Sequence, residues 1–180
     1  MTDLDLVFDF DGWKLSGVYI FSAPDAFAFL GVEDTPPTET ITEPNVLERL
    51  AARLTGRKLE ARRRISDDQA LVFSRLGLSL EYDVIRIFEF EIQVQKDEVL
   101  EVSAFPGRFV FGMDKIDLSP TTTIQNVKDL FGTPNDEDPD LDFISYNIQD
   151  YELTFWFDEK HNLERIVGFW DYIATKETEA

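Results

Sequence analysis

Alternating apolar and polar residues mark the strands that this sequence predicts. The alternation runs through residues 71–84 and 85–94 in the first half of the chain, and through residues 142–172 in the second half. Successive side chains of a β-strand point to opposite faces, so each segment is expected to bury one face and leave the other wetter. One-sided strands of this kind are typical of an antiparallel sheet with one packed face.

The same alternation assigns individual side chains to the two faces of the predicted sheet. The packed face is expected to hold Leu78, Leu80, Tyr82, Phe88, Phe90, Ile92, Val94, Tyr151, Leu153, Phe155 and Phe157. The wetter face is expected to hold Ser79, Glu81, Glu89, Glu91, Gln93, Glu152, Thr154, Trp156 and Asp158. Carboxylates and one tryptophan are therefore predicted to share a face that is turned to solvent.

The order of predicted elements is repeated along the chain. Residues 6–16 and 108–119 each read as an apolar strand, a polar turn and a short second strand that ends in Leu-Ser. A short helix ending at a glycine, Gly31 or Gly132, follows in both halves, and then a turn-rich acidic segment and more strands. This matched order predicts two diverged copies of one unit.

Both short helices carry start signals. Ser22 is a plausible N-cap of the first helix, with Pro24 in its first turn, and Thr123 is a plausible N-cap of the second helix. The apolar side chains of the helices are expected to pack on the same sheet face and to be buried. These side chains are Phe27, Leu30, Val127, Leu130 and Phe131.

These patterns divide the chain into the following parts. The first repeat spans residues 1–94 with a helical, basic insertion at about 38–69, a linker spans 95–107, the second repeat spans 108–174, and residues 175–180 form a frayed tail. One short helix cannot cover a sheet face alone, whereas two units side by side can. We therefore predict an α+β protein with one continuous antiparallel sheet and helices on one of its faces.

The charge of the chain restricts its partners. The 180 residues carry a net charge of −19, which repels nucleic acids and anionic membranes and attracts basic proteins. Residues 49–64 hold seven bases and one acid, a balance of +6 that leaves −25 for the rest of the chain. Solubility or adaptation to salt would explain the acidity equally well. The basic segment can likewise be explained as a solvated helix face.

The residue types that usually carry chemistry are scarce. The chain has no cysteine and one histidine, His161, which is predicted to lie in a turn. The acidic residues 135–142 lack the glycine and the distant glutamate of a calcium-binding loop, and the chain has no phosphate-binding glycine motif. We therefore expect no catalytic residue, no metal site and no cofactor, and we expect the protein not to be an enzyme.

The first residues do not resemble a targeting segment. Three aspartates fall within the first nine residues, where a signal peptide would be basic, and no apolar run is long enough to cross a bilayer. The expected location is the cytoplasm, without membrane contact.

The second half of the chain resembles a known protein family. A capped helix that ends in Phe-Gly-Thr-Pro is followed by an acidic loop and by ISYNIQDYELTFWFDEKHNLERI. This arrangement resembles the repeat unit of β-lactamase-inhibitor proteins, closely over residues 105–172 and loosely over 6–94. It is also similar to small lipoproteins of the outer-membrane assembly machine and to uncharacterised bacterial immunity-type families. The resemblance implies a tandem repeat that binds protein through an exposed sheet face and has no catalytic residues.

These observations favour a protein that binds and neutralises a basic toxin or enzyme. An acidic sheet face that bears aromatic anchors suits such a role, because the anchors provide affinity and the charge speeds association. The candidate partner-binding residues are Glu89, Glu91, Glu152, Trp156, Asp158 and Trp170. The basic residues 49–64 are an alternative binding site, and the oligomeric state is open. A carboxylate-based hydrolase and an acidic structural or adaptor subunit are the alternative functions.

Overall fold

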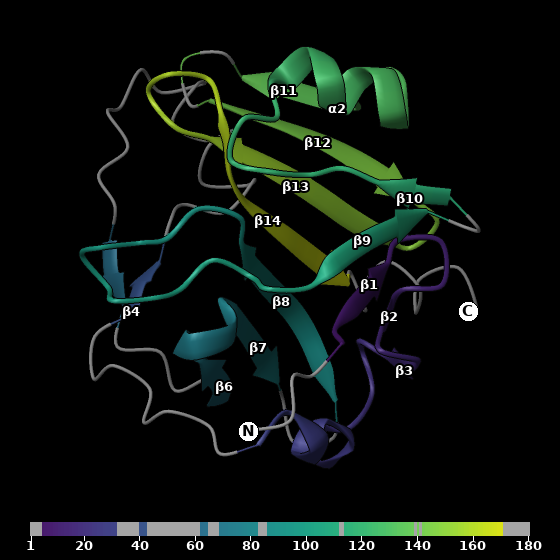
Figure 1. Cartoon of the computed structure of the whole chain (residues 1–180), viewed down its shortest axis with the longest axis vertical. Coiled ribbons are helices and arrows are strands. Elements are labelled where there is room, and N and C mark those ends of the chain that lie inside the picture. The colour runs from purple at the N-terminus through teal and green to yellow at the C-terminus, as the bar shows by residue number, and fades with distance from the viewer. Residues whose placement is uncertain are drawn as a thin grey trace, which may run out of the picture.

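A computed structural model shows a sheet-rich α+β fold with few helices (Figure 1). It describes residues 5–31, 40–42, 62–64, 69–82, 86–111, 114–138, 140 and 142–170. Most of the described strands belong to two sheets, so the expectation of one continuous sheet is wrong.

The larger sheet has seven strands, and every neighbouring pair in it is antiparallel. Its order is β11-β12-β13-β14-β8-β7-β6. The strands are β6 (Gln69–Phe73), β7 (Leu78–Tyr82), β8 (Ile87–Gln93), β11 (Asp136–Asp138), β12 (Phe143–Ile148), β13 (Tyr151–Phe157) and β14 (Leu163–Trp170). The first half of the chain therefore supplies three consecutive strands and the second half supplies four, and the two sets meet where β8 pairs with β14. The division of the chain into two repeats stays a prediction.

The smaller sheet has five strands in the order β10-β9-β1-β2-β3. The strands are β1 (Val7–Asp9), β2 (Lys14–Leu15), β3 (Val18–Tyr19), β9 (Arg108–Phe111) and β10 (Asp114–Ile116). The two predicted strand–turn–strand segments form hairpins, and β1 pairs with β9 in parallel. The alternation of residues cannot reveal this pairing, because it shows which side chains are buried and not which strand lies alongside.

The five-stranded sheet covers one face of the seven-stranded sheet, which we call the inner face (Figure 1). The rings of Phe8 and Phe90 lie 5.0 Å apart and those of Phe10 and Phe155 lie 6.4 Å apart, so β1 packs on β8 and β13. The cross-strand neighbour of Phe90 on β14 is Gly168. A Cβ at this glycine would lie 2.1 Å from a ring carbon of Phe90, so the close packing of the Phe90 ring against the β14 backbone requires glycine here.

Both short helices form, but the type and the N-cap of the first one differ from the prediction. The first is a 3-10 helix, η1 (Pro24–Leu30), and the second is an α-helix, α2 (Ile124–Phe131). Thr123 caps α2 in a capping box with Asn126, and Gly31 and Gly132 end the two helices, as expected. The Ser22 cap is wrong, because Ala23 is the N-cap residue of η1 and makes no side-chain cap.

Phe27, Leu30 and Val127 are buried in the common core, as expected, whereas Phe131 is only partly buried and packs against it. Leu130 is 43% exposed, so its predicted burial is wrong. Helix α2 is only about two turns long, so a narrow face of it packs against the core. Phe131 rather than Leu130 contacts the inner-face rings of Tyr146 and Phe155.

Two strand assignments also change. The segment predicted as one strand at 71–84 is, as far as Tyr82, a hairpin of β6 and β7, because the short 3-10 helix η2 (Ser74–Leu76) separates the two strands. The register between β7 and β8 shifts between Glu81 and Tyr82 of β7, so that Glu81 pairs with Glu89 and Tyr82 pairs with Ile87. Ile87 is therefore fully buried, while Phe88 is only half-buried and contacts the ring of Phe169.

The insertion is described only at its ends, where β4 (Thr40–Thr42) pairs with β5 (Arg62–Arg64). Its predicted helix and the predicted tail at residues 175–180 lie outside the described residues. None of the helices in the described part of the chain combines the length and apolar character that a membrane crossing requires.

Candidate functional site

The face of the seven-stranded sheet opposite β1 is the candidate site, and we call it the outer face. The pairing of β13, β14 and β8 arranges its side chains in three rows across the strands. These rows are Glu152–Phe169–Glu89, Thr154–Val167–Glu91 and Trp156–Arg165–Gln93. Four of the predicted partner-binding residues, Glu89, Glu91, Glu152 and Trp156, therefore share one face.

Trp156 is only 9% exposed, so the expectation that it faces solvent is wrong. Two neighbours on the adjacent strands cover it. The guanidinium carbon of Arg165 lies 5.0 Å from the centre of the Trp156 ring, and the ring of Phe143 lies 5.2 Å away. A long arginine side chain can cover apolar surface with its stem while its charge interacts with the aromatic face. Trp156 thus stabilises this part of the sheet.

Phe169 is the aromatic side chain that the outer face exposes, at 37%. Its cross-strand neighbours are Glu152 on β13 and Glu89 on β8, and Phe88 packs beside its ring at 6.3 Å. An exposed aromatic between two carboxylates is the arrangement that the sequence led us to expect at Trp156. The alternation of residues 163–170 could have placed Phe169 on the side opposite Trp170, but only the strand register shows that it lies between these two glutamates.

Negative charge dominates the outer face. On β7, β8, β13 and β14 its charged side chains are Glu81, Glu89, Glu91, Glu152 and Arg165. Glu81 and Glu89 lie directly opposite each other, which concentrates negative charge at one point of the face. The Arg165 Nη1 atom lies 3.6 Å from a Glu91 carboxylate oxygen, and the Gln93 amide donates to the same carboxylate at 2.5 Å.

The other two predicted residues lie elsewhere. Asp158 begins the turn between β13 and β14, where its carboxylate accepts from the Lys160 and Asn162 amides. Burial of Asp158 favours its neutral form, but hydrogen bonds from the Asn162 amide and from Gln95 outweigh this effect and hold its pKa below the ordinary value. Trp170 is on the inner side, where it contacts Phe21 and Tyr151.

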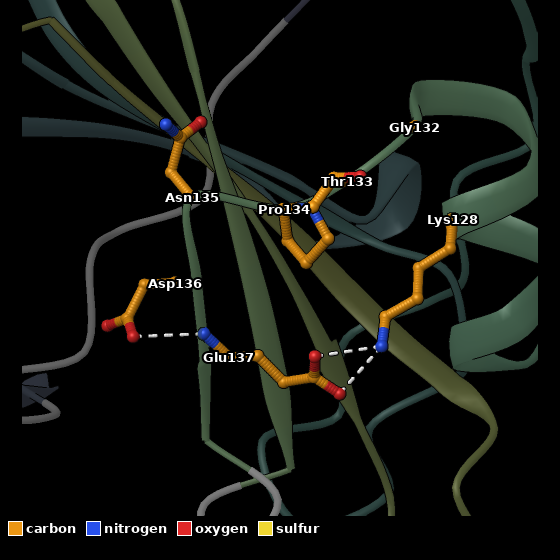
Figure 2. A pocket seen from close by; sticks show the side chains of 7 residues that line it. All are labelled: Lys128, Gly132, Thr133, Pro134, Asn135, Asp136 and Glu137. Carbon is orange, nitrogen blue, oxygen red and sulfur yellow. Dashed lines mark hydrogen bonds and ion pairs between the residues drawn. The ribbon is translucent and has the colours of Figure 1, made fainter.

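A shallow hollow lies between the end of α2 and β11 (Figure 2). It measures about 490 Å³ and is lined by Lys128, by residues 132–135, and by Asp136 and Glu137. The Lys128 ammonium donates to both carboxylate oxygens of Glu137, at 2.7 and 2.8 Å. This pairing neutralises the one cation of the hollow, so the hollow offers little to an anionic ligand.

Among the residues that the structure describes, His161 has the surroundings of an exposed turn residue rather than of a catalytic base. His161 lies in the turn after β13, as expected, with a φ of 59°. Its side chain is 64% exposed, and its Nδ1 atom lies 3.1 Å from Asp142. Within the described residues, no three histidine or carboxylate side chains are grouped so that they could hold a metal ion.

Comparison with known proteins adds little. No known protein family and no curated protein matches the sequence. Among solved structures, the chain is similar to a DUF4309 family protein, YjgB, from Bacillus subtilis subsp. subtilis str. 168. The two are 12% identical, the match covers 80% of this chain and 91% of that chain, and the TM-score is 0.36. A likeness at this level supports no conclusion about function.

Proposed function

We propose that this chain is a non-catalytic binding protein that blocks a basic protein partner through the outer face of its seven-stranded sheet. A bacterial immunity protein or enzyme inhibitor of cytoplasmic location is the form of this role that the residues favour. The observation that carries the proposal is the exposed Phe169 between Glu152 and Glu89. The resemblance of residues 105–172 to β-lactamase-inhibitor proteins supports the same role.

The chemistry of the outer face suits a basic partner. On β7, β8, β13 and β14 the outer face carries four glutamates and one arginine, within a chain whose net charge is −19. Such a field steers a positively charged protein toward the face and raises the association rate at low salt. A rigid aromatic that loses its remaining exposure on binding then slows dissociation.

Replacement of Phe169 tests the proposal. The protein should be co-expressed with a toxic basic protein that is encoded beside its gene, and growth should be scored with the wild type and with Phe169→Ala. We expect rescue by the wild type and a loss of rescue with the variant. With the purified pair, the affinity should fall by about 2 kcal/mol, which is the effect of a typical interface hot spot.

Phe111→Ala is the matched control, because Phe111 is 41% exposed on β9 of the other sheet. It loses the same ring at similar exposure and should keep full affinity. Glu89→Lys and Glu152→Lys should slow association more at low salt than at high salt. Asp117→Lys, at an exposed position just after β10, should change the association rate less. Equal losses for Phe169→Ala and Phe111→Ala would refute the assignment of the outer face.

A further inference from the structure

The segment between the two halves of the chain ends in an exposed apolar tip. Val99 is 89% exposed and Leu100 is 51% exposed, which makes them the two most exposed large apolar side chains in the described part of the chain. Figure 1 shows this segment as a teal hairpin that extends to the left, away from the two sheets. Adjacent apolar side chains that project from an acidic protein require an explanation.

The hairpin is held by internal hydrogen bonds. The backbones of Asp97 and Val102 exchange two hydrogen bonds, at 2.9 and 3.0 Å. The Asp97 carboxylate accepts from the backbone amides of Val99 and Leu100, at 2.8 and 2.9 Å. Glu101 takes a left-handed conformation, with a φ of 57°, which is uncommon outside glycine and persists where the surroundings enforce it. These hydrogen bonds therefore support the backbone of the tip.

Both ends of the hairpin are fixed to the seven-stranded sheet or to the short segments that join its strands. On the first side, the Gln95 amide donates to the Glu164 carbonyl at 2.9 Å, and its side chain donates to Asp158 at 3.1 Å. On the second side, the Ser103 amide donates to the Ser74 carbonyl at 2.7 Å. The carbonyl of Ser103 would lie 2.2 Å from a Cβ at residue 77, so Gly77 permits this close approach.

The second side is also anchored in the core. The Phe105 amide donates to the Gln93 carbonyl at 2.7 Å, and the buried Phe105 ring packs 5.5 Å from that of Phe109. A segment that only linked two repeats would not need anchors at both ends. Fixing a loop before it binds lowers the entropy that binding must overcome.

The sides of the hairpin are acidic. Residues 96–101 contain Asp97, Glu98 and Glu101 and a single base, Lys96. Lys96 lies 3.9 Å from Glu98, and both side chains are well exposed, so this ion pair leaves most of the acidic character in place. An apolar tip with acidic sides fits an apolar pocket with a basic rim, and its charge disfavours an anionic membrane.

We propose that residues 96–102 form a second contact element, in which Val99 and Leu100 enter an apolar pocket with a basic rim on the protein partner. This inference rests on the proposed function and names how the partner is held beyond the outer face. The contact that the hairpin makes is separate from that of Phe169. The binding free energy lost when the hairpin tip is altered should therefore add to that lost when Phe169 is replaced.

The test uses a purified basic protein that the wild-type chain neutralises in the co-expression assay, and it measures binding kinetics with the full-length chain. The double variant Val99→Ser/Leu100→Ser should raise the dissociation rate at least tenfold and change the association rate by less than twofold. Leu130→Ser is the matched control, because Leu130 is an exposed apolar side chain on α2. It should dissociate like the wild type. All three substitutions are on the surface and should keep the wild-type unfolding midpoint.

The outcomes separate the two proposals. If the wild type neutralises and binds no basic protein in these assays, the proposed function and the hairpin contact both fail. If Phe169→Ala weakens binding while Val99→Ser/Leu100→Ser dissociates like the wild type, the hairpin contact alone is wrong. It is also overturned if the wild type forms dimers in sedimentation and the double variant does not, because the tip then serves a second copy of the chain.

Discussion

Replacement of Trp156 by alanine should destabilise the protein rather than merely weaken binding. Trp156 is on the outer face, but it is 9% exposed and packed between Arg165 and Phe143. A buried aromatic side chain removes about 150–250 Å² from water, which at about 25 cal/mol per Å² corresponds to roughly 4–6 kcal/mol. The unfolded chain already buries part of this area, which lowers the expected loss to about 3–5 kcal/mol.

Urea unfolding, followed by circular dichroism, measures this loss. A domain is stable by about 5–15 kcal/mol, so Trp156→Ala should move the midpoint strongly and reduce the folded yield. Trp156→Phe keeps an aromatic ring beside Phe143 and should lose much less. Phe169→Ala should also lose less, about 1–2 kcal/mol, because 37% of that side chain is already exposed.

The critical result is the comparison of the unfolding free energy lost by Trp156→Ala with that lost by Phe169→Ala. If Trp156→Ala unfolds at the wild-type urea concentration, the side chain is not a structural support, and the packing by Arg165 and Phe143 contributes little. A loss for Phe169→Ala as large as that for Trp156→Ala would also refute the reasoning, since it would remove the distinction between a supporting and a binding aromatic on the same face.

Two further predictions concern the core and the pH dependence of stability. Gly168→Ala should lower the free energy of unfolding by about 1–3 kcal/mol, because the added Cβ meets the Phe90 ring. In a double-mutant cycle, Phe90→Leu should relieve part of this loss. Strictly additive losses would contradict the contact. Burial, followed by the nearby Glu137 charge, raises the pKa of Tyr146 to about 12, above the value of about 10 in an unfolded chain. Its neutral form is therefore favoured by folding, and the associated stability should be complete below about pH 10 and decrease as the pH rises toward 12. Tyr146→Phe should make urea midpoints fall less steeply over this interval, and an unchanged slope would contradict the assignment.

The sequence predicted local structure well where a local cause acts. The Thr123 cap, the glycines that end the helices and the strands between residues 143 and 170 are all present, because caps, turns and alternation depend on neighbouring residues. The burial of Phe90, Phe155 and Val127 is also as expected. The break at η2 was missed, because the apolar residues on both sides of it read as one strand.

The candidate site was predicted in part for the same reason. Alternation placed Glu89, Glu91, Glu152 and Trp156 on one side of their strands, and the pairing of β8 with β14 brings them onto one face. It could not show that Arg165 covers Trp156, because that contact joins two strands. Only the structure therefore shows that the exposed aromatic side chain of this face is Phe169 and not Trp156.

The sequence by itself determined the α+β class, the hairpins, the short helices and the acidic character, since each depends on composition or on spacing within one segment. Tertiary structure alone decided that β1 pairs with β9 in parallel and builds a second sheet over the inner face. It also decided that the segment at 95–107 is an anchored hairpin with an exposed tip rather than a plain linker. These features depend on contacts between residues about 10 to 100 positions apart, and pairing energies of this kind leave no periodic signal in a single sequence.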